Sequence, residues 1–455
     1  MVGGSDHECS GEVSRGALAG LAGCAALVHA GLLGLYWFPT QKVLWGDENT
    51  YWRSAKALLA GDPSWRPDPL WPDGYPRFLA GIVGVAGEHL IAVQMVQTAL
   101  LVIAACVLAD LVCRIAGSRI AGFVAGGLMV VFPPVVAFGH SLWSEALHLF
   151  LFVALLWMLV CRSRRLAWCV LAGVTAGLAL LTKSLLGPFV PVLMFAAFAR
   201  RPAIFWMTRA GLFAIALALT IAPSVAHQYR HTGRLMIADS SAFNLWVGLN
   251  DRARRNFEID VVSGAYLEYS TSGDTFAERD AELRRKISNY AAQNSWVTIV
   301  RGQLGRQFFR LFDKDSYLTD QLPGGAAVLR YGAGYVAAGD GVAALVRGLS
   351  YAIYGVLLAA APLGLLLWRY RDRRWARVLV LFVLYNLAIF FWLHTKSRFR
   401  IQMLPVLFMG AGCAVALIES RARGVANQVP AWRWVVAVIG VVALEFFAFA
   451  GPWLP

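Results

Sequence analysis

Long apolar runs separated by short polar segments recur along nearly the whole chain. There are about eleven such runs, and most approach the roughly 17–25 residues that a helix needs to cross a bilayer, although some are shorter. The runs lie at residues 16–38, 89–113, 120–138, 142–161, 166–181, 185–198, 212–222, 349–368, 378–393, 401–418 and 434–450. None shows the alternation of a barrel strand, so the pattern predicts an all-α polytopic membrane protein.

The polar segments between the runs divide the chain into three predicted parts. Residues 1–222 form an N-terminal transmembrane module whose first external loop spans 39–87, and residues 348–455 form C-terminal transmembrane helices. The intervening residues 223–347 form one large hydrophilic region, where the spacing of apolar residues over 278–312 predicts amphipathic helices. Shorter interfacial helices are expected at 51–60 and 76–87 within the first loop.

Composition and charge agree with this picture. The chain has 455 residues, 58% of them hydrophobic and 15% charged, with a mean hydropathy of +0.58, which excludes an ordinary soluble protein. The net charge of +14 is carried largely by arginines in alternate short loops, where it orients a membrane protein and does not indicate nucleic-acid binding. We therefore predict an integral plasma (inner) membrane protein with a cytoplasmic N-terminus and the 39–87 loop outside. The seven cysteines show neither metal-ligand spacing nor placement for an external disulfide.

Two adjacent acids, Asp47 and Glu48, follow the first apolar run in a loop rich in aromatic residues and proline. Such a loop is typical of sequence packed at the membrane surface, where tryptophan and tyrosine lie at headgroup level. A partly water-excluded carboxylate there has a pKa useful to a general base or a metal ligand. The alternative is an ordinary solvated acidic pair.

A third acid, Glu145, begins the fourth apolar run. Helical spacing predicts that Ser141, Glu145 and His148 share one face about a turn below the external surface. Because a carboxylate within the membrane is costly, a functional site is the default interpretation. The alternative is a carboxylate bonded to a neighbouring helix for packing.

Cations occur on the external side, where positive charge is normally depleted. Lys183 lies in the short turn after the fifth run, and Lys396, Arg398 and Arg400 precede the tenth. Snorkelling anchors explain one or two such residues. A group of them in tight turns indicates an anionic ligand at the outer leaflet, of which a phosphate is the obvious example.

Together these features resemble the GT-C superfamily of integral-membrane glycosyltransferases. The nearest branch contains protein O-mannosyltransferases, lipid A aminoarabinose transferases and RgtA/B/C/D-like transferases. The resemblance covers residues 32–417. It is carried by Asp47-Glu48, residues 72–80, Ser144-Glu145, residues 177–183, residues 243–250, and residues 396–400 with Pro405.

The resemblance implies a sugar donor carried on a polyprenyl or dolichyl phosphate and an acceptor hydroxyl outside the cytoplasm, on a glycan, a lipid or a protein. Asp47 then looks like the general base, Glu48 polarises it or helps to hold the acceptor or a metal, and Glu145 is the second acid of the cavity. Direct displacement with one base predicts inversion at the anomeric carbon. The remaining residues it implies are Lys183, Lys396, Arg398 and Arg400 for the lipid phosphate, and Tyr75, His140 and Asn244 for the cavity or the acceptor.

The resemblance leaves several alternatives open. Some relatives use a divalent ion, for which Asp47 and Glu145 are the candidate ligands. The external region has no evident peptide-binding module, which weakens the case for a protein acceptor. A transporter or lipid flippase would also have many spans and buried charges, but it predicts inverted repeats and charges near the bilayer midplane. A catalytically inactive membrane scaffold of the same fold is the third possibility. The sequence names neither the sugar nor the oligomeric state.

Overall fold

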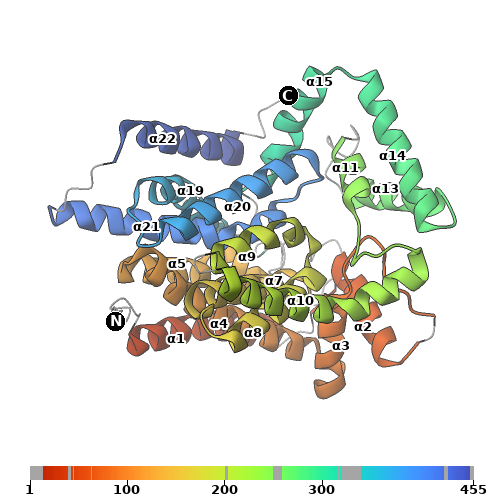
Figure 1. Cartoon of the computed structure of the whole chain (residues 1–455), viewed down its shortest axis with the longest axis horizontal. Coiled ribbons are helices and arrows are strands. Elements are labelled where there is room, and N and C mark those ends of the chain that lie inside the picture. The colour runs from red at the N-terminus through yellow and green to blue at the C-terminus, as the bar shows by residue number, and fades with distance from the viewer. Residues whose placement is uncertain are drawn as a thin grey trace.

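The computed structural model describes residues 14–38, 42–44, 46–62, 64–199, 203–249, 259–314, 318, 340–424 and 429–450. Every regular element within these ranges is a helix, which confirms the predicted all-α class. Each of the predicted apolar runs is helical. Figure 1 shows the long helices running side by side, with the N-terminus at one end of the bundle.

Eight helices of the described chain are long and apolar enough to cross a membrane. They are α1 (Arg15–Leu32) continued by η1 (Leu33–Trp37), α4 (Leu90–Ala116), α7 (Glu145–Trp157) continued by η2 (Met158–Arg162), α10 (Ala203–Thr232), α19 (Asp340–Leu367), α20 (Arg373–Trp392), α21 (Leu404–Ala422), and α22 (Ala431–Glu445) continued by η6 (Phe446–Ala450). The shorter runs form α8 (Leu166–Thr182), and η3 (Ser184–Phe189) followed by α9 (Val190–Phe198). The protein is thus an integral membrane protein.

A ninth span is a bent pair, α5 (Arg119–Val131) and α6 (Pro133–His140), whose axes differ by 54°. The break has a local cause, because Phe132 precedes two prolines and adopts an extended backbone with φ −74° and ψ 110°. After α6 the chain remains non-helical until α7 begins at Glu145. Ser141 therefore lies outside α7 and does not share a helical face with Glu145 and His148, which corrects the prediction from spacing.

Close approach of small residues holds the C-terminal spans together. A Cβ atom added to Gly364 of α19 would lie 1.8 Å from the carbonyl oxygen of Gly410 in α21. One added to Gly412 would lie 2.2 Å from the carbonyl oxygen of Ala121 in α5. Small residues at such crossings let the helix backbones meet, as is usual between helices in lipid.

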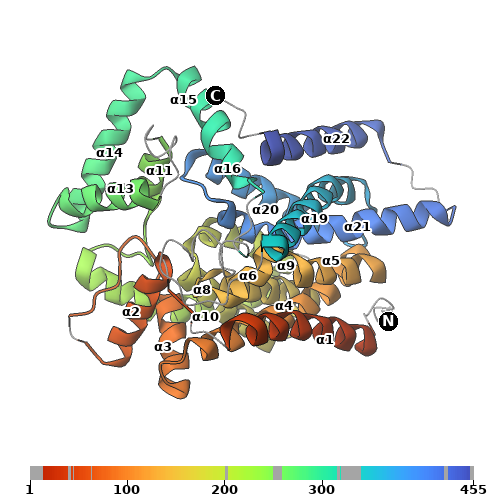
Figure 2. The same ribbon diagram turned by 180° about the vertical axis from the view of Figure 1, so that it is seen from behind.

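The shorter helices gather at one end of the bundle, opposite the N-terminus (right in Figure 1, left in Figure 2). They are α2 (Asp47–Leu59), α3 (Gly74–Ala86), α11 (Ser241–Leu249), α13 (Ile259–Thr271) and α14 (Phe276–Gln293). α15 (Trp296–Gly302), η4 (Gln303–Phe308) and α16 (Phe309–Leu311) then lead back toward the spans. The helices predicted within 278–312 are therefore confirmed. α10 runs through Pro223 to Thr232, so the predicted boundary at 222 falls inside one helix.

Candidate active site

A cavity of about 560 Å³ lies at the end of the bundle where α2 and α3 gather. Its walls come from the first turns of α2, the segment before α3, α11, α13, the start of the segment before α7, and the segment after α20. The lining residues are Gly46, Asp47, Thr50, Tyr51, Ser54, Trp65, Arg66, Asp68, Trp71, Pro72, Asp73, Pro76, Trp143, Phe243, Tyr266, Lys396 and Arg398. Three of the predicted site residues, Asp47, Lys396 and Arg398, therefore line one cavity.

Asp47 is the first residue of α2, which begins before the predicted residue 51. The preceding Gly46 has a φ of 56°, a left-handed conformation that favours glycine and turns the chain into the helix. The Asp47 carboxylate accepts a hydrogen bond from the Arg398 guanidinium, and 40% of its side chain stays exposed. Burial raises the pKa of Asp47, but the charges of Arg398 and Lys396 outweigh it and hold the pKa below its usual value.

Arg398 lies between the two predicted acids. It belongs to η5 (Ser397–Gln402), and while it binds Asp47, its Nε is 4.0 Å from Oε1 of Glu145. The guanidinium also lies over the indole ring of Trp143, 5.0 Å from the ring centroid. This stacking fixes the plane of the guanidinium and leaves its edge toward the cavity.

Lys183 reaches the same cluster from another helix. α8 ends at Thr182, Lys183 takes an extended backbone, and its Nζ lies 3.0 Å from Oε1 of the buried Glu145. The cluster thus joins two carboxylates, Asp47 and Glu145, with three cations, Lys183, Lys396 and Arg398. With every group ionised, three positive and two negative charges leave a formal charge of +1.

The ammonium group of Lys396 has a perturbed pKa. Burial and the nearby charge of Arg398 lower its pKa to about 8, against the opposing effect of Asp47 and Glu145. A cation held in a water-poor site binds an anion more strongly than a solvated lysine does.

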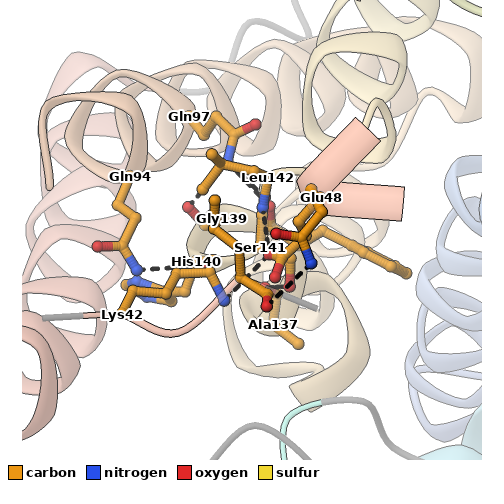
Figure 3. Close-up of polar contacts among 12 residues, drawn as sticks. Lys42, Glu48, Gln94, Gln97, Ala137, Gly139, His140, Ser141 and Leu142 are labelled. Atoms are coloured by element: carbon orange, nitrogen blue, oxygen red, sulfur yellow. Dashed lines mark hydrogen bonds and ion pairs between the residues drawn. The ribbon is translucent and has the colours of Figure 1, made fainter. Parts of the chain in front are cut away.

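Glu48 is not among the residues that line the cavity, and Figure 3 shows it among the polar contacts around Leu142. Its carboxylate lies 3.0 Å from the Nζ of Lys42, and both side chains are almost fully buried. The same carboxylate accepts the backbone N–H of Leu142 at 2.7 Å. Glu48 therefore ties the loop before α2 to the loop before α7, and the expectation that it polarises Asp47 or holds the acceptor does not match this placement.

Two glutamines of α4 hold the segment that leads to Glu145 (Figure 3). Gln97 donates to the carbonyl oxygen of Ser141 at 2.7 Å and accepts the hydroxyl of Tyr75 at 2.7 Å, and Gln94 donates to the carbonyl oxygen of His140 at 3.0 Å. These bonds satisfy the carbonyl groups of a non-helical segment inside a helical bundle. In the sequence, Gln94 and Gln97 are two amides about one turn apart in an apolar run. This pair indicates a buried polar contact, and the sequence analysis did not identify it.

Residues 72–227 match the model of a family described as dolichyl-phosphate-mannose-protein mannosyltransferase. The matched segment contains Asp73, Tyr75, Trp143, Glu145 and Lys183. It begins downstream of Asp47. The match covers about a third of the chain and supports the resemblance to the GT-C superfamily.

The chain matches no curated protein sequence. Among solved structures it is similar to the Archaeoglobus fulgidus oligosaccharyltransferase in its apo form, with a TM-score of 0.49, 15% identity, and coverage of 96% of this chain and 55% of the other. The similarity to Archaeoglobus fulgidus AglB bound to an inhibitory peptide and a dolichol-phosphate has a TM-score of 0.47, 16% identity, and coverage of 95% and 55%. The chain thus spans about half the length of these structures.

Four further predicted site residues do not line the cavity. Tyr75 is buried against Gln97, and His140 is buried with its Nε2 3.0 Å from Nδ1 of His29. Asn244 donates to Ser240, and its backbone oxygen accepts the N–H of His394 at 2.8 Å, so it anchors the segment that carries Lys396. The predicted cavity or acceptor roles of Tyr75, His140 and Asn244 therefore give way to positioning roles.

The fourth is Arg400, which is 3% exposed. Its guanidinium donates to the carbonyl oxygens of Leu311 and Asp313 and lies 4.3 Å from the ring centroid of Tyr354. Sequence spacing grouped Arg400 with Arg398, but in a 3-10 helix residues two apart face different directions. Arg400 thus joins η5 to the end of α16, and its predicted phosphate contact is not supported.

The predicted metal ligands do not form a divalent site. Among the described residues no three His, Cys, Asp or Glu side chains gather as metal ligands. Asp47 and Glu145 instead hold Arg398 between them, and Glu145 also holds Lys183. A divalent ion there would be repelled by three neighbouring cations.

Several lining residues were missed by the sequence analysis as site residues. Asp73 accepts hydrogen bonds from Ser224 at 2.6 Å and Arg77 at 2.8 Å, and joins the start of α3 to α10. The aromatic and polar groups on the far side of the cavity include Trp71, Asp68 and Tyr266. The sequence before α3 is rich in proline and tryptophan, which indicated a packed loop. Composition alone does not show which of its rings face the cavity.

Proposed function

We propose that this protein is a glycosyltransferase that moves a sugar from a polyprenyl-phosphate donor to an acceptor hydroxyl outside the cytoplasm, with inversion at the anomeric carbon. The observation that carries the proposal is the cluster of Asp47, Glu145, Lys183, Lys396 and Arg398 at one cavity. The cluster combines a carboxylate open to solvent with cations in excess. It lies at the end of the bundle opposite the N-terminus, and the distribution of arginines among the loops supports placing that end outside.

The excess charge suits the proposed donor. A sugar linked to a lipid through one phosphate is a phosphodiester with a single negative charge, which matches the formal charge of +1 of the cluster. Lys396 and Arg398 line the cavity and would bind this phosphate directly. Lys183 does not line the cavity, but its ammonium group is bound to Glu145 and adds positive charge to the cluster.

In the proposed reaction Asp47 takes the proton of the acceptor hydroxyl as its oxygen attacks the anomeric carbon. The bond from that carbon to the phosphate oxygen breaks on the opposite face, and the electron pair leaves with the phosphate. Lys396 and Arg398 stabilise the charge that grows on the departing oxygen. The products are the inverted glycoside and polyprenyl phosphate, and the proton on Asp47 returns to water.

Arg398 links donor binding to the base. Without a donor its guanidinium is bonded to Asp47 and keeps the pKa of this carboxyl low, which makes Asp47 a weak base. A phosphate competes for the same guanidinium, so donor binding withdraws positive charge from Asp47 and strengthens it as a base. The proposed order is therefore donor first and acceptor deprotonation second.

The first experiment compares cells that carry the wild-type protein, Asp47→Asn, Asp62→Asn or no copy. Asp62 is an exposed acid at the end of α2 that accepts only local hydrogen bonds from Ser64, so it is a matched control. Mass spectrometry of external glycolipids, polysaccharides and secreted proteins should find a product heavier by one sugar with the wild type and Asp62→Asn alone. Identical profiles in all four strains, with unchanged lipid-linked sugars, would contradict the proposal and favour a transporter or a scaffold.

A further inference from the structure

The proposed chemistry leaves part of the cavity lining unused. There the rings of Trp71, Phe243 and Tyr266 contact one another, with centroid distances of 5.7 Å between Trp71 and Phe243 and 6.1 Å between Trp71 and Tyr266. Phe243 is buried, whereas Tyr266 is 41% exposed. All three line the cavity. We call these three rings the aromatic shelf.

Polar groups flank the aromatic shelf. The hydroxyl of Tyr266 donates to Oδ2 of Asp68 at 3.1 Å, and the N–H of Leu70 donates to its Oδ1 at 2.8 Å. Asp68 and Arg66 both line the cavity. Each carboxylate oxygen has lone-pair capacity beyond the one bond described, so Asp68 can accept further hydrogen bonds from a ligand.

The shelf is held in place before any ligand arrives. Gln228 of α10 donates to the backbone oxygen of Asp68 at 3.0 Å, and the N–H of Asp239 donates to the backbone oxygen of Pro69 at 2.8 Å. Beneath the rings, Leu70, Val247 and Tyr269 form a small apolar core. The loop that carries Trp71 is therefore fixed to both α10 and α11. Ligand binding would then cost little conformational entropy in this loop.

We propose that the aromatic shelf and Asp68 bind a sugar ring of the acceptor, so that the acceptor is a saccharide. This inference rests on the proposed function and adds its substrate class. A pyranose or furanose ring has a face of C–H groups, which are weakly positive, and an edge of hydroxyl groups. The faces of aromatic rings are negative and complement the C–H groups, while a carboxylate with free lone pairs accepts from the hydroxyls.

Other acceptors fit these residues less well. An acyl chain would desolvate the Asp68 carboxylate and the Arg66 guanidinium without adding a polar partner to either. One recurring mode of binding an extended peptide is backbone pairing with a sheet edge, and the described walls here are helices and loop side chains. The cavity of about 560 Å³ lies within the roughly 300–1,000 Å³ of small-ligand sites. Asp47 lines the same cavity, so the proposed base and a sugar on the shelf would share one space.

The test measures saccharide binding in the absence of any donor. The purified protein in lipid nanodiscs is titrated with methyl glycosides and trisaccharides of mannose, glucose, galactose and arabinose, and saturation-transfer NMR reports binding and the ring protons in contact. We expect saturable binding of at least one probe, with the strongest transfer to protons on one ring face. Trp71→Ala should weaken this binding about tenfold, whereas Trp71→Phe should keep most of it.

Two controls separate the shelf from the rest of the protein. Trp296→Ala removes an exposed tryptophan of α15 that does not line the cavity, and it should bind as the wild type does. Asp62→Asn changes an exposed acid that does not line the cavity, and it should also bind the probe as the wild type does. Unfolding temperatures of all variants check that loss of binding is not loss of fold.

The outcomes distinguish this inference from the proposed function. If a probe binds through Trp71 but the wild type transfers no sugar, the shelf is supported and the proposed reaction is wrong. If sugar transfer is found on a lipid or a peptide and no saccharide binds, the reaction stands and the saccharide inference is overturned. Equal binding by Trp71→Ala and the wild type would likewise overturn it.

Discussion

Asp47 and Glu48 are adjacent in the first turn of α2, yet their carboxylates face opposite environments. Asp47 opens into the cavity and bonds Arg398, whereas Glu48 is completely buried between Lys42 and the N–H of Leu142. Successive residues of a helix point about 100° apart, so a single turn separates a solvent-accessible acid from a buried one. The first is the acid that we propose for the chemistry, and the second joins two loops through Lys42 and Leu142.

The buried ion pair makes Glu48 important for stability. Glu48→Gln would leave the Lys42 ammonium buried without a countercharge, and we expect a loss of about 3–5 kcal/mol in the free energy of unfolding. Glu88→Gln changes an exposed acid paired with Lys56 and should change stability by less than about 1 kcal/mol. Thermal unfolding in nanodiscs measures both. A normal unfolding temperature for Glu48→Gln would show that the pair is not structural.

The sequence predicted the helices well and the division of labour between the two acids poorly. Apolar runs predict membrane-spanning helices because each helix must be long enough to cross the bilayer without help from other segments. The direction of Glu48 depends instead on Leu142, a partner far along the chain. Likewise, Arg398 and Arg400 look equivalent in sequence, and only the contact of Arg400 with the end of α16 separates them. Trp71 and Tyr266, which share a wall, come from segments that no local pattern joins.

Arg398 and Arg400 should respond differently to the same substitution. Arg398→Lys keeps a charge at the cavity but loses the stacked, forked guanidinium, so donor affinity should fall about tenfold with little change in stability. Arg400→Lys would leave buried carbonyl groups of Leu311 and Asp313 poorly satisfied, and should cost about 1–3 kcal/mol of unfolding free energy. Donor-binding and thermal-unfolding measurements on both variants test this. If Arg400→Lys instead lowered donor affinity and Arg398→Lys lowered stability, Arg400 would again be the candidate for binding the phosphate.

The close contact of α19 with α21 predicts a sharp difference between two glycines of one helix. Gly364→Ala would force a methyl group against the Gly410 backbone, whereas Gly348→Ala meets no atom within 4 Å. We expect Gly364→Ala to lose about 1–3 kcal/mol through overpacking or displaced helices. Gly348→Ala should be neutral or slightly stabilising, since alanine favours the helix. The yield of folded protein and its unfolding temperature decide between them, and equal behaviour would contradict the described crossing.

The lowered pKa of Lys396 predicts how kcat/KM for the donor depends on pH. Its pKa is lowered to about 8, so the side chain is charged below that value and becomes neutral as the pH rises through it. A phosphodiester donor keeps its charge throughout this range, so kcat/KM for the donor should fall above pH 8 because the free enzyme loses a cation. Lys396→Arg stays charged and should move the decline to higher pH. A decline at the same pH in this variant would assign it to another group.

The bond between Arg398 and Asp47 predicts that activity also falls at low pH, where Asp47 becomes protonated. The pH of this acidic limb of the pH–rate profile should change when the donor binds. In the free enzyme the cations hold the pKa of Asp47 below its usual value, so the carboxylate is lost only at low pH. In the donor complex the phosphate competes for Arg398, and the pKa of Asp47 rises. The acidic limb of kcat should therefore lie at higher pH than that of kcat/KM measured for the donor, since the first reports the complex and the second the free enzyme. Arg398→Met removes the charge in both states, so the two limbs should converge. If they already coincide in the wild type, donor binding does not release Asp47 and the proposed order of events fails.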